Sequence, residues 1–428
     1  MGVSSENADN LWHRTCAERV EAPALSGDVQ ADLVVIGGGF TGCSAALHGA
    51  QAGADVCLLE AETIGFGGSG RNVGLVNAGL WLPPDEIGGH LGAEAGDRLI
   101  ALLAGAPSVV FELIDRHGIA CEAVRNGTLH CAHSPAGLKD LYTRHAQLVA
   151  AGAPVEMISA EGVAQRTGSA TFHGALFDPR AGTIQPLGYV RGLARAAQAA
   201  GARLHERTPA LEIRREGDLW HVRTPGGEVR ARALIQATNA YHTGWPGTAP
   251  AYVPVHYFQF ATPPLTEVQR AAILPGGEGC WDTALVMSSF RMDGAGRMII
   301  GAMGDLGHPG SAIHAGWARR KLTQLYPALA GVPLQQGWCG RIAMTSDHIP
   351  KITQIGPNAL AAHGYSGRGI GPGTVFGEGM AESLLTGNPE ALPVAPVAEH
   401  RESLTRVRQA YFETGATLTH LIKARIGY

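Results

Sequence analysis

The segment 31–62, ADLVVIGGGFTGCSAALHGAQAGADVCLLEAE, constrains the fold more than any other stretch of the chain. The apolar run at 32–36 is typical of a parallel strand covered on both faces, and it leads directly into the turn GGGFTG. In such a turn Gly37 permits the sharp bend, Gly39 lets a pyrophosphate approach the backbone, and Gly42 lets the following helix pack against the strand. The spacing therefore predicts a dinucleotide site at the N-terminus of a helix.

The second half of this segment limits which dinucleotide can bind. A stretch of helical composition is followed by a second strand, which ends at Glu60, 18 residues after Gly42. A carboxylate in this position accepts hydrogen bonds from ribose hydroxyls and repels a 2′-phosphate. The pattern favours NAD or FAD, and the alternative is a glycine-rich turn in an unrelated α/β domain.

A second glycine-rich loop, GFGGSGRNVG, begins five residues after Glu60 and carries one fixed positive charge, Arg71. A plain NAD domain has no need of this loop, whereas FAD extends beyond the pyrophosphate as a ribityl chain and an isoalloxazine ring. Glycines let backbone N–H groups approach that ring, and Arg71 can lie near phosphate or flavin. The alternative is a flexible surface loop.

Composition limits the partners and the compartment. The chain has 428 residues, enough for two or three domains, and a formal net charge of −4, so neither nucleic acid nor an anionic membrane is expected as a partner. Its seven cysteines are scattered without a CxxC or Cys/His spacing, so we expect no metal site and a reducing compartment. The polar N-terminus and the lack of a long apolar run predict a cytoplasmic protein. Whether the chain forms a homo-oligomer is left open.

The two glycine-rich segments resemble those of the FAD-dependent oxidoreductases of the D-amino-acid oxidase and glycine oxidase superfamily, and most of all its gamma-glutamylputrescine oxidase family. Further stretches extend the resemblance over nearly the whole chain: FDPRAGTIQPLGYVRGLARAAQAAGARL, CWDTALVMSSFRMDGAGRMIIGAMG and WCGRIAMTSDHIPKITQIGPNALAAHGYSGRGIGPG. The resemblance implies an α/β fold, in which a Rossmann-like FAD-binding domain of the glutathione-reductase type is interleaved with an α+β substrate domain carrying a mixed or antiparallel sheet.

The expected domains are discontinuous. We place the FAD-binding domain at 28–90, 155–250 and 336–390, with its strands near 32–36, 55–60, 202–206, 232–237 and 359–363. The substrate domain is expected at 91–154 and 251–335, and a helical tail at 391–428. The stretch LEIRREGDLWHVRTPGGEVRAR alternates and contains a Gly-Gly turn, which predicts an antiparallel excursion.

The motifs and the resemblance together imply a set of FAD contacts. A helix beginning near Thr374 is expected to point its N-terminus at the flavin, where its dipole favours the negatively charged reduced form. The FAD is expected to be non-covalent, and Cys339 is the residue that could instead form a link. The expected contacts are Gly37, Gly39, Phe40, Thr41, Gly42, Glu60, Ala61, Gly68, Ser69, Gly70, Arg71, Asn72, Gly74, Leu75, Ala210, Thr238, Asn239, Gly340, Gly364, Tyr365, Ser366, Gly367, Arg368, Gly369 and Ile370.

The resemblance implies oxidation of a primary or secondary amine by hydride transfer from its α-carbon to flavin N5, giving an imine that hydrolyses. The nitrogen must be neutral, so the site needs low polarity and aromatic walls rather than a strong acid–base pair. His256, Tyr365 and Arg341 are the candidates for catalysis. The candidates for substrate contact are Trp81, His256, Phe258, Phe290 and Trp338, with His256 and Phe258 on the same side of one strand.

Several alternatives stay open at this point. The acceptor is expected to be O2, but the position of the oxygen-activating lysine in sarcosine oxidases corresponds to Ile299, which leaves room for another acceptor. Gly371 stands where those enzymes carry a carboxylate-binding lysine, which favours a longer amine over a small α-amino acid. The other readings are an amino-acid oxidase or dehydrogenase of the same fold, or a flavoprotein without catalytic activity.

Overall fold

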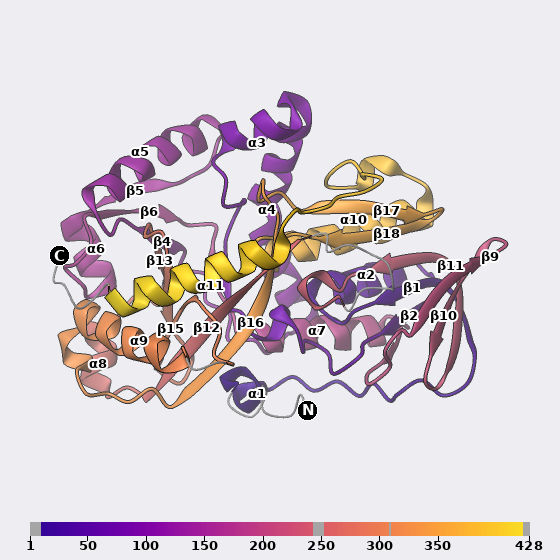
Figure 1. Cartoon of the computed structure of the whole chain (residues 1–428), viewed down its shortest axis with the longest axis horizontal. Coiled ribbons are helices and arrows are strands. Elements are labelled where there is room, and N and C mark those ends of the chain that lie inside the picture. Colours follow the sequence, from indigo (N-terminus) through magenta and orange to yellow (C-terminus); the bar gives the residue numbers. More distant parts are fainter. Residues whose placement is uncertain (1–9, 243–251, 308–309, 423–428) are drawn as a thin grey trace.

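The computed structural model describes residues 10–242, 252–307 and 310–422. Two large sheets form two lobes that lie side by side, and helices pack against both sheets (Figure 1). Within the described ranges, no helix is both long enough and apolar enough to cross a membrane. The predicted domain boundary at 250–251 and the last residues of the predicted tail lie outside these ranges.

The first sheet has the strand order β17-β18-β11-β1-β2-β8, and a hairpin extends it through β11. The pairs β18–β11, β11–β1, β1–β2 and β2–β8 are parallel, and the outer strand β17 is antiparallel. All five predicted strands of this sheet are confirmed, as is the antiparallel excursion, which forms β9 and β10. The strand bounds are β1 Val29–Ile36, β2 Val56–Leu59, β8 Arg203–His205, β9 Glu212–Glu216, β10 Leu219–Thr224, β11 Gly227–Gln236, β17 Lys351–Gly356 and β18 Ala359–His363.

Three helices, α2 (Phe40–Gln51), α7 (Pro186–Ala199) and α10 (Ile370–Thr386), pack together over this sheet. Small residues let α2 and α10 approach closely, since a Cβ on Gly377 would lie 2.2 Å from the carbonyl oxygen of Thr41. The long helix α4 (Ala93–His117) packs on α7 and α10 and shares their apolar core. We predicted α4 as part of the substrate domain, but its buried leucine and valine face joins the first lobe instead.

The second sheet has the order β16-β12-β15-β14-β13-β4-β6-β5 and is antiparallel except for the parallel pair β13–β4. The predicted α/β class with a second, mixed sheet is confirmed. Three of its strands, β5, β6 and β16, lie in segments that we assigned to the FAD-binding domain, and the chain crosses between lobes more often than predicted. The bounds are β4 Thr128–Cys131, β5 Glu156–Ser159, β6 Gly174–Asp178, β12 Val253–Pro264, β13 Gly279–Asp282, β14 Ser288–Met292, β15 Arg297–Met303 and β16 Gln336–Met344.

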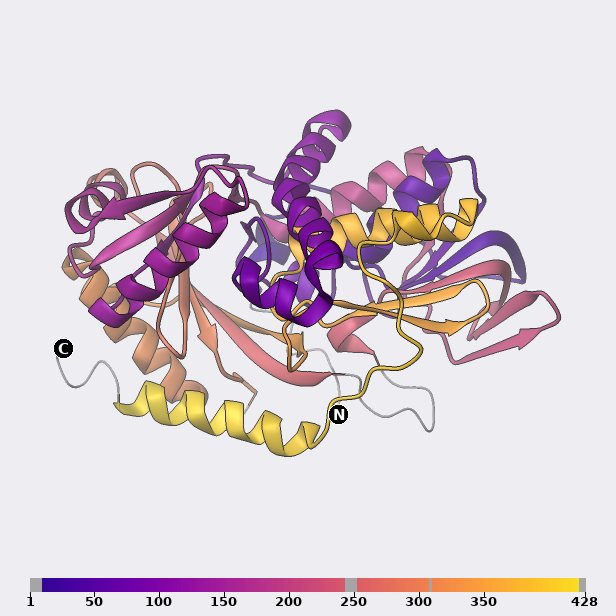
Figure 2. The ribbon, with the colours of Figure 1, turned by 90° about the horizontal axis from the view of Figure 1, so that it is seen from above.

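One face of the second sheet is covered by α9 (Ser311–Leu325) and α11 (Thr405–Ile422), and the length of α11 runs along the edge of this lobe in Figure 2. Beneath them lies a core that contains Phe258, Phe260 and Trp317. The opposite face of β12 turns toward the first lobe. The remaining elements are α1 Leu11–Thr15, α3 Pro84–Leu91, α5 Pro135–Ala150, α6 Ala160–Thr167, α8 Glu267–Ala272, and the small sheet of β3 Leu75–Val76 with β7 Gly182–Thr183.

Candidate active site

A cavity of about 610 Å³ lies where the two lobes meet. This volume is within the range of sites that bind cofactors and drug-sized ligands. Its two sides differ in construction. One side, which we name the glycine wall, comes from the first lobe and is mostly backbone; it comprises Gly39, Phe40, Thr41, Gly68, Ser69, Gly369, Ile370 and Gly371. The other, the side-chain wall, comes from the second sheet and comprises Val255, Tyr257, Gln259, Trp281, Ser289 and Met303.

The first glycine turn has no room for side chains. A Cβ on Gly42 would lie 1.9 Å from the carbonyl oxygen of Gly37, and a Cβ on Gly37 would lie 2.8 Å from that of Ala237. Gly37 also has φ +107°, a conformation that L side chains rarely adopt. These contacts bring the carboxyl ends of β1 and β11 and the start of α2 together, at the edge where ligands of open α/β sheets bind.

Glu60 follows β2 and buttresses this turn. Its Oε2 accepts a hydrogen bond of 2.6 Å from the Gly38 N–H, and its Oε1 accepts one of 2.9 Å from the Glu62 N–H. Burial raises the pKa of the Glu60 carboxyl. The side chain lies behind the turn, outside the set of residues that line the cavity.

The second glycine loop closes against both the first turn and β16. The Phe40 N–H donates to Ser69 Oγ at 3.0 Å, which joins the loop to the start of α2. The buried Arg71 donates from Nε to the Phe66 carbonyl and from a terminal nitrogen to the Cys339 carbonyl, at 2.7 and 3.0 Å. Two segments that are about 270 residues apart in sequence are thereby held at one end of the cavity.

Helix α10 begins at Ile370, four residues before the predicted start at Thr374. Pro372 is tolerated there, because the first turn of a helix does not need its N–H groups. The Thr374 hydroxyl donates to the Ile370 carbonyl at 2.8 Å, inside the helix. The preceding loop is fixed by a 2.8 Å hydrogen bond between the hydroxyls of Tyr365 and Thr41, so the N-termini of α2 and α10 lie beside the same cavity.

Most of the predicted cofactor contacts line this cavity. The structure brings together Gly39, Phe40, Thr41, Gly68, Ser69, Arg71, Asn72, Leu75, Asn239, Gly340, Tyr365, Ser366, Gly367, Arg368, Gly369 and Ile370. The others do not reach it: Gly37, Gly42, Glu60, Ala61, Gly70, Gly74, Ala210, Thr238 and Gly364. Several of the residues that do not reach the cavity shape the backbone behind the glycine wall, as Gly37, Gly42 and Glu60 do.

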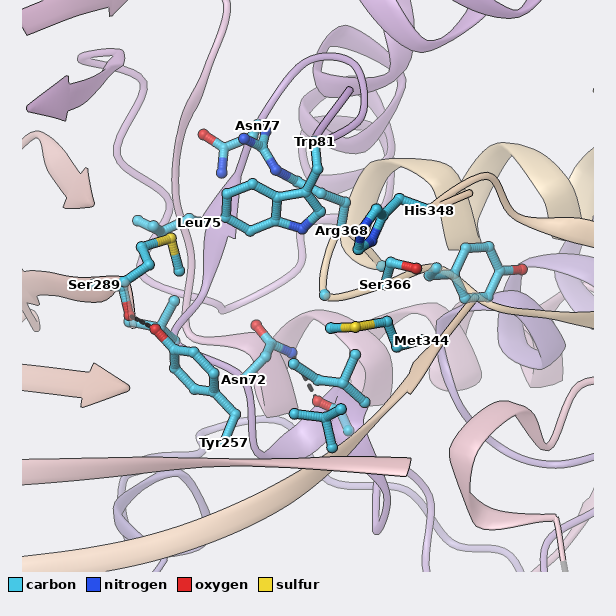
Figure 3. A pocket seen from close by; sticks show the side chains of 18 of the residues that line it. Asn72, Leu75, Asn77, Trp81, Tyr257, Ser289, Met344, His348, Ser366 and Arg368 are labelled. Carbon is cyan, nitrogen blue, oxygen red and sulfur yellow. Dashed lines mark hydrogen bonds between the residues drawn. The ribbon is translucent and has the colours of Figure 1, made fainter. Parts of the chain in front are cut away.

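The prediction that His256 and Phe258 face the cavity is wrong. The two residues do share one side of β12, but Val255, Tyr257 and Gln259 of the other side line the cavity. The Tyr257 hydroxyl donates to Ser289 Oγ at 3.1 Å, and Figure 3 shows this pair on the side-chain wall.

The covering helices explain this orientation. Phe258 is fully buried, and its ring centroid lies 5.1 Å from that of His314 on α9 and 5.8 Å from that of His420 on α11. His256 Nδ1 lies 3.9 Å from a carboxylate oxygen of Asp305. The alternating pattern of β12 shows which of its residues share a face. It does not show which of the two faces the helices cover, and that face is the one buried beneath them.

Other predicted substrate residues are divided. Trp81 lines the cavity, whereas Phe290 is stacked on Phe172 in the core of the second lobe. Trp338 is buried as well, and its Nε1–H donates to the Arg71 carbonyl at 2.9 Å. Arg341 lies at the cavity but its guanidinium stacks over Tyr241, 4.5 Å from the ring centroid.

Cys339 points away from the cavity. Its thiol lies 3.6 Å from the carbonyl oxygens of Gly304 and Gly340, and burial raises its pKa to about 12. The reactive form of a cysteine is the thiolate, which this environment disfavours.

Sequence reasoning missed several polar and aromatic residues of the cavity. Lys321 donates to the buried Asp282 carboxylate at 2.9 Å, and Ser288 donates to the same group. The sequence did carry a signal for two of them: the strand GCWD places a tryptophan and a carboxylate side by side in an apolar segment. The missed lining residues are Asn77, His130, Tyr257, Gln259, Trp281, Asp282, Ser289, Met303 and Met344. Across the described ranges, no group of three or more His, Cys, Asp or Glu side chains could hold a metal ion.

Comparisons with known proteins agree with this geometry. Residues 32–383 match the sequence profile of the family described as FAD dependent oxidoreductase. The chain is 33% identical to the probable oxidoreductase OrdL of Rhizobium meliloti, over 87% of this chain and 88% of that protein. It is 30% identical to the gamma-glutamylputrescine oxidoreductase of Escherichia coli, over 90% and 91%.

Solved structures show the same fold. Glycine oxidase from Geobacillus kaustophilus superposes with a TM-score of 0.68 at 20% identity, covering 84% of this chain and 95% of that one. L-proline dehydrogenase from P. horikoshii gives a TM-score of 0.70 at 20% identity, covering 86% and 98%. The chain therefore belongs to the DAO family of FAD dependent oxidoreductases, and FAD is its cofactor.

Proposed function

We propose that this protein oxidises the C–N bond of a primary or secondary amine, with FAD at the glycine wall and the amine against the side-chain wall. The observation that carries the proposal is the cavity itself, in which backbone from one lobe faces tyrosine, tryptophan and methionine side chains from the other. The 30% identity to a gamma-glutamylputrescine oxidoreductase over nine-tenths of the chain supports an amine as the substrate.

The glycine wall fits FAD. The turn at Gly37–Gly42 carries no Cβ at its tightest points, so a ligand can approach its backbone closely, and the start of α2 favours phosphate. The Ser69 loop and the start of α10 continue this surface along the cavity. Because the Cys339 thiol points away and is hard to ionise, we propose that the cofactor is bound without a covalent link.

When bound at the glycine wall, FAD would supply a two-electron acceptor for the hydride on the carbon beside the amine nitrogen, and the amine would become an imine that water hydrolyses. This chain's residues orient the amine and exclude water. The aromatic and thioether side chains of Trp81, Tyr257 and Met303 make that part of the cavity weakly polar, which favours the neutral, reactive amine over the ammonium form. Burial lowers the pKa of His130 to about 3, so this histidine is neutral at pH 7 and adds no charge.

We propose O2 as the electron acceptor, with a different acceptor as the alternative. The described lining residues include no lysine, and Ile299 is buried in the core beside the cavity. None of the described lining residues is therefore specific for oxygen, and peroxide formation identifies the acceptor.

The test is anaerobic reduction of the FAD-loaded protein. Purified protein is mixed with amines, diamines, N-methyl amines, γ-glutamylputrescine and amino acids, and the visible flavin absorbance is followed. We expect bleaching by amines, followed by peroxide release when air is admitted. If amino acids alone bleach the flavin, the amine assignment is wrong.

A flavin that no compound bleaches, although dithionite reduces it, would contradict catalysis altogether. Bleaching by amines without peroxide in air would retain the amine but exclude O2 as the acceptor. As a control for site specificity, the exposed Arg98→Met variant, which lies on the surface in an ion pair with Glu390, should behave as the unmodified protein does.

A further inference from the structure

One arginine of the cavity, Arg368, has no carboxylate partner among the described residues. The guanidinium carbon of Arg368 lies 4.6 Å from the ring centroid of Trp81 and 5.0 Å from that of Trp281. Figure 3 shows Arg368 and Trp81 together on one side of the cavity. In the described part of the chain, the Arg368 side chain forms no ion pair, and its one hydrogen bond is a long contact of 3.5 Å to the Ala78 carbonyl. Its buried Nε has no hydrogen-bond partner among the residues that the structure describes.

A second donor beside Arg368 is also unsatisfied. Trp281 lines the same cavity, is 6% exposed, and its buried Nε1–H has no acceptor within the described residues. Leaving a buried donor without an acceptor costs about 1–3 kcal/mol, and more for a charged one. Two neighbouring donors without acceptors indicate a place for a ligand that brings oxygen atoms.

The nearby carboxylates already accept hydrogen bonds from other side chains. Asp282 accepts from Lys321 and Ser288, Asp140 accepts from Arg144 at 2.8 Å, and Asp178 accepts two hydrogen bonds from the Arg180 guanidinium. Burial lowers the pKa of Arg368 to about 9, so it stays a cation at pH 7. This end of the cavity therefore has one positive charge that none of the described residues neutralises.

The indoles also fix the direction of the guanidinium. Trp81 is held by Arg144, which donates to its carbonyl at 2.7 Å, and Trp281 is stacked on His130 with 5.0 Å between ring centroids. A planar guanidinium between two rings keeps its edge free, and that edge binds carboxylates through two parallel hydrogen bonds.

From this geometry we infer that Arg368, with the Trp281 Nε1–H, binds a carboxylate that the substrate amine carries away from its reacting carbon. The inference rests on the proposed amine oxidation and specifies the substrate class as an amine with a distant acidic group. Arg368 was predicted as a contact of FAD, but its side chain reaches Trp281 of the side-chain wall.

The test compares amines that differ only at the far end. Hexylamine and 6-aminohexanoate, and γ-glutamylputrescine and putrescine, are measured with the unmodified protein and with Arg368→Met, Arg368→Lys and Trp281→Phe. We expect Arg368→Met to raise KM for the carboxylate compounds about 30-fold and to change KM for hexylamine and putrescine less than about threefold. Arg368→Lys should recover part of the loss, and Trp281→Phe should give a smaller one. Arg98→Met is the matched control.

A binding measurement separates this inference from the proposed function. Glutarate, which cannot be oxidised as an amine, is titrated into the FAD-loaded protein while tryptophan fluorescence is followed. Saturable quenching that Arg368→Met abolishes supports the inference even if no amine bleaches the flavin. An equal loss with both members of an amine pair, no preference for carboxylates in the unmodified protein, or a shifted flavin spectrum in an otherwise folded Arg368→Met would overturn it.

Discussion

The glycine wall and the side-chain wall face each other across one cavity, yet their residues are fixed by different forces. In the first lobe, backbone atoms approach so closely that a single added carbon at Gly42 would lie 1.9 Å from an oxygen. In the second lobe, side chains are positioned by hydrogen bonds and charge, as Tyr257 is by Ser289 and Asp282 is by Lys321. We therefore expect the glycine wall to tolerate few substitutions, whereas single residues of the side-chain wall can be replaced without loss of the fold.

The largest expected effect is at Gly42. Gly42→Ala places a Cβ against the Gly37 carbonyl, and backbone must move to relieve the clash. We expect a loss of about 5 kcal/mol or more in the free energy of unfolding, with loss of bound FAD. Chemical unfolding and the visible absorbance of the purified protein measure both.

Gly105→Ala is the matched control, because Gly105 lies within helix α4 and an added Cβ would meet nothing within 4 Å. This change should stabilise the protein by about 0.5–1 kcal/mol. A Gly42→Ala protein that is yellow and as stable as the control would show that the glycine wall is not as tightly packed as described.

The next effect is on the ion pair behind the side-chain wall. Burial by itself raises the pKa of Asp282, but the Lys321 ammonium and the Ser288 hydrogen bonds outweigh it, so the pKa is lowered. Lys321→Met leaves the carboxylate buried without its partner, which should cost about 3–5 kcal/mol at pH 7. Denaturant unfolding at several pH values measures the difference.

The pH dependence follows from the lowered pKa. The carboxylate contributes stability above its unfolded value near pH 4, and this contribution is lost as the pH falls through its lower folded value. The gap between the unmodified protein and Lys321→Met should therefore narrow on acidification. A gap that is the same at pH 7 and pH 4 would mean that the pair does not stabilise the wall through charge.

A smaller effect is expected at Tyr257. Tyr257→Phe keeps the ring but removes the hydroxyl that bonds to Ser289 and, at 3.3 Å, to the Gly301 carbonyl. We expect kcat/KM for the amine to fall about fivefold, which corresponds to the loss of about 1 kcal/mol, while FAD affinity is unchanged. The exposed Tyr142→Phe is the control, and a Tyr257→Phe protein that loses FAD would show that the two walls are not separate in function.

The smallest effect is expected at His256. His256→Ala alters the face of β12 that turns toward α9 and α11, so steady-state kinetics should give kcat and KM within about twofold of the original values. A fall of 100-fold or more would restore the sequence-based prediction that this histidine acts on the substrate.

The sequence predicted the first lobe well because its signals are local. The strands around Gly37 and Glu60, and the loop that carries Arg71, follow from spacing and from the limits on glycine. The orientation of β12 could not be predicted from local signals. Tyr257 and His256 fit the alternating pattern equally well, and the packing of α11, about 150 residues later in the chain, decides which of them faces the cavity. The pairing of Arg368 with Trp281 depends on tertiary contacts that no local pattern encodes.

The most direct test of the division between the two walls is a crystal structure of the protein with FAD bound. We predict that the phosphates lie at Gly39–Thr41 and that the flavin lies along the Ser69 loop and the start of α10, while the space between Tyr257, Trp81 and Arg368 stays open for the amine. Flavin in contact with the Arg368 guanidinium and filling the space beside Tyr257 would contradict the account.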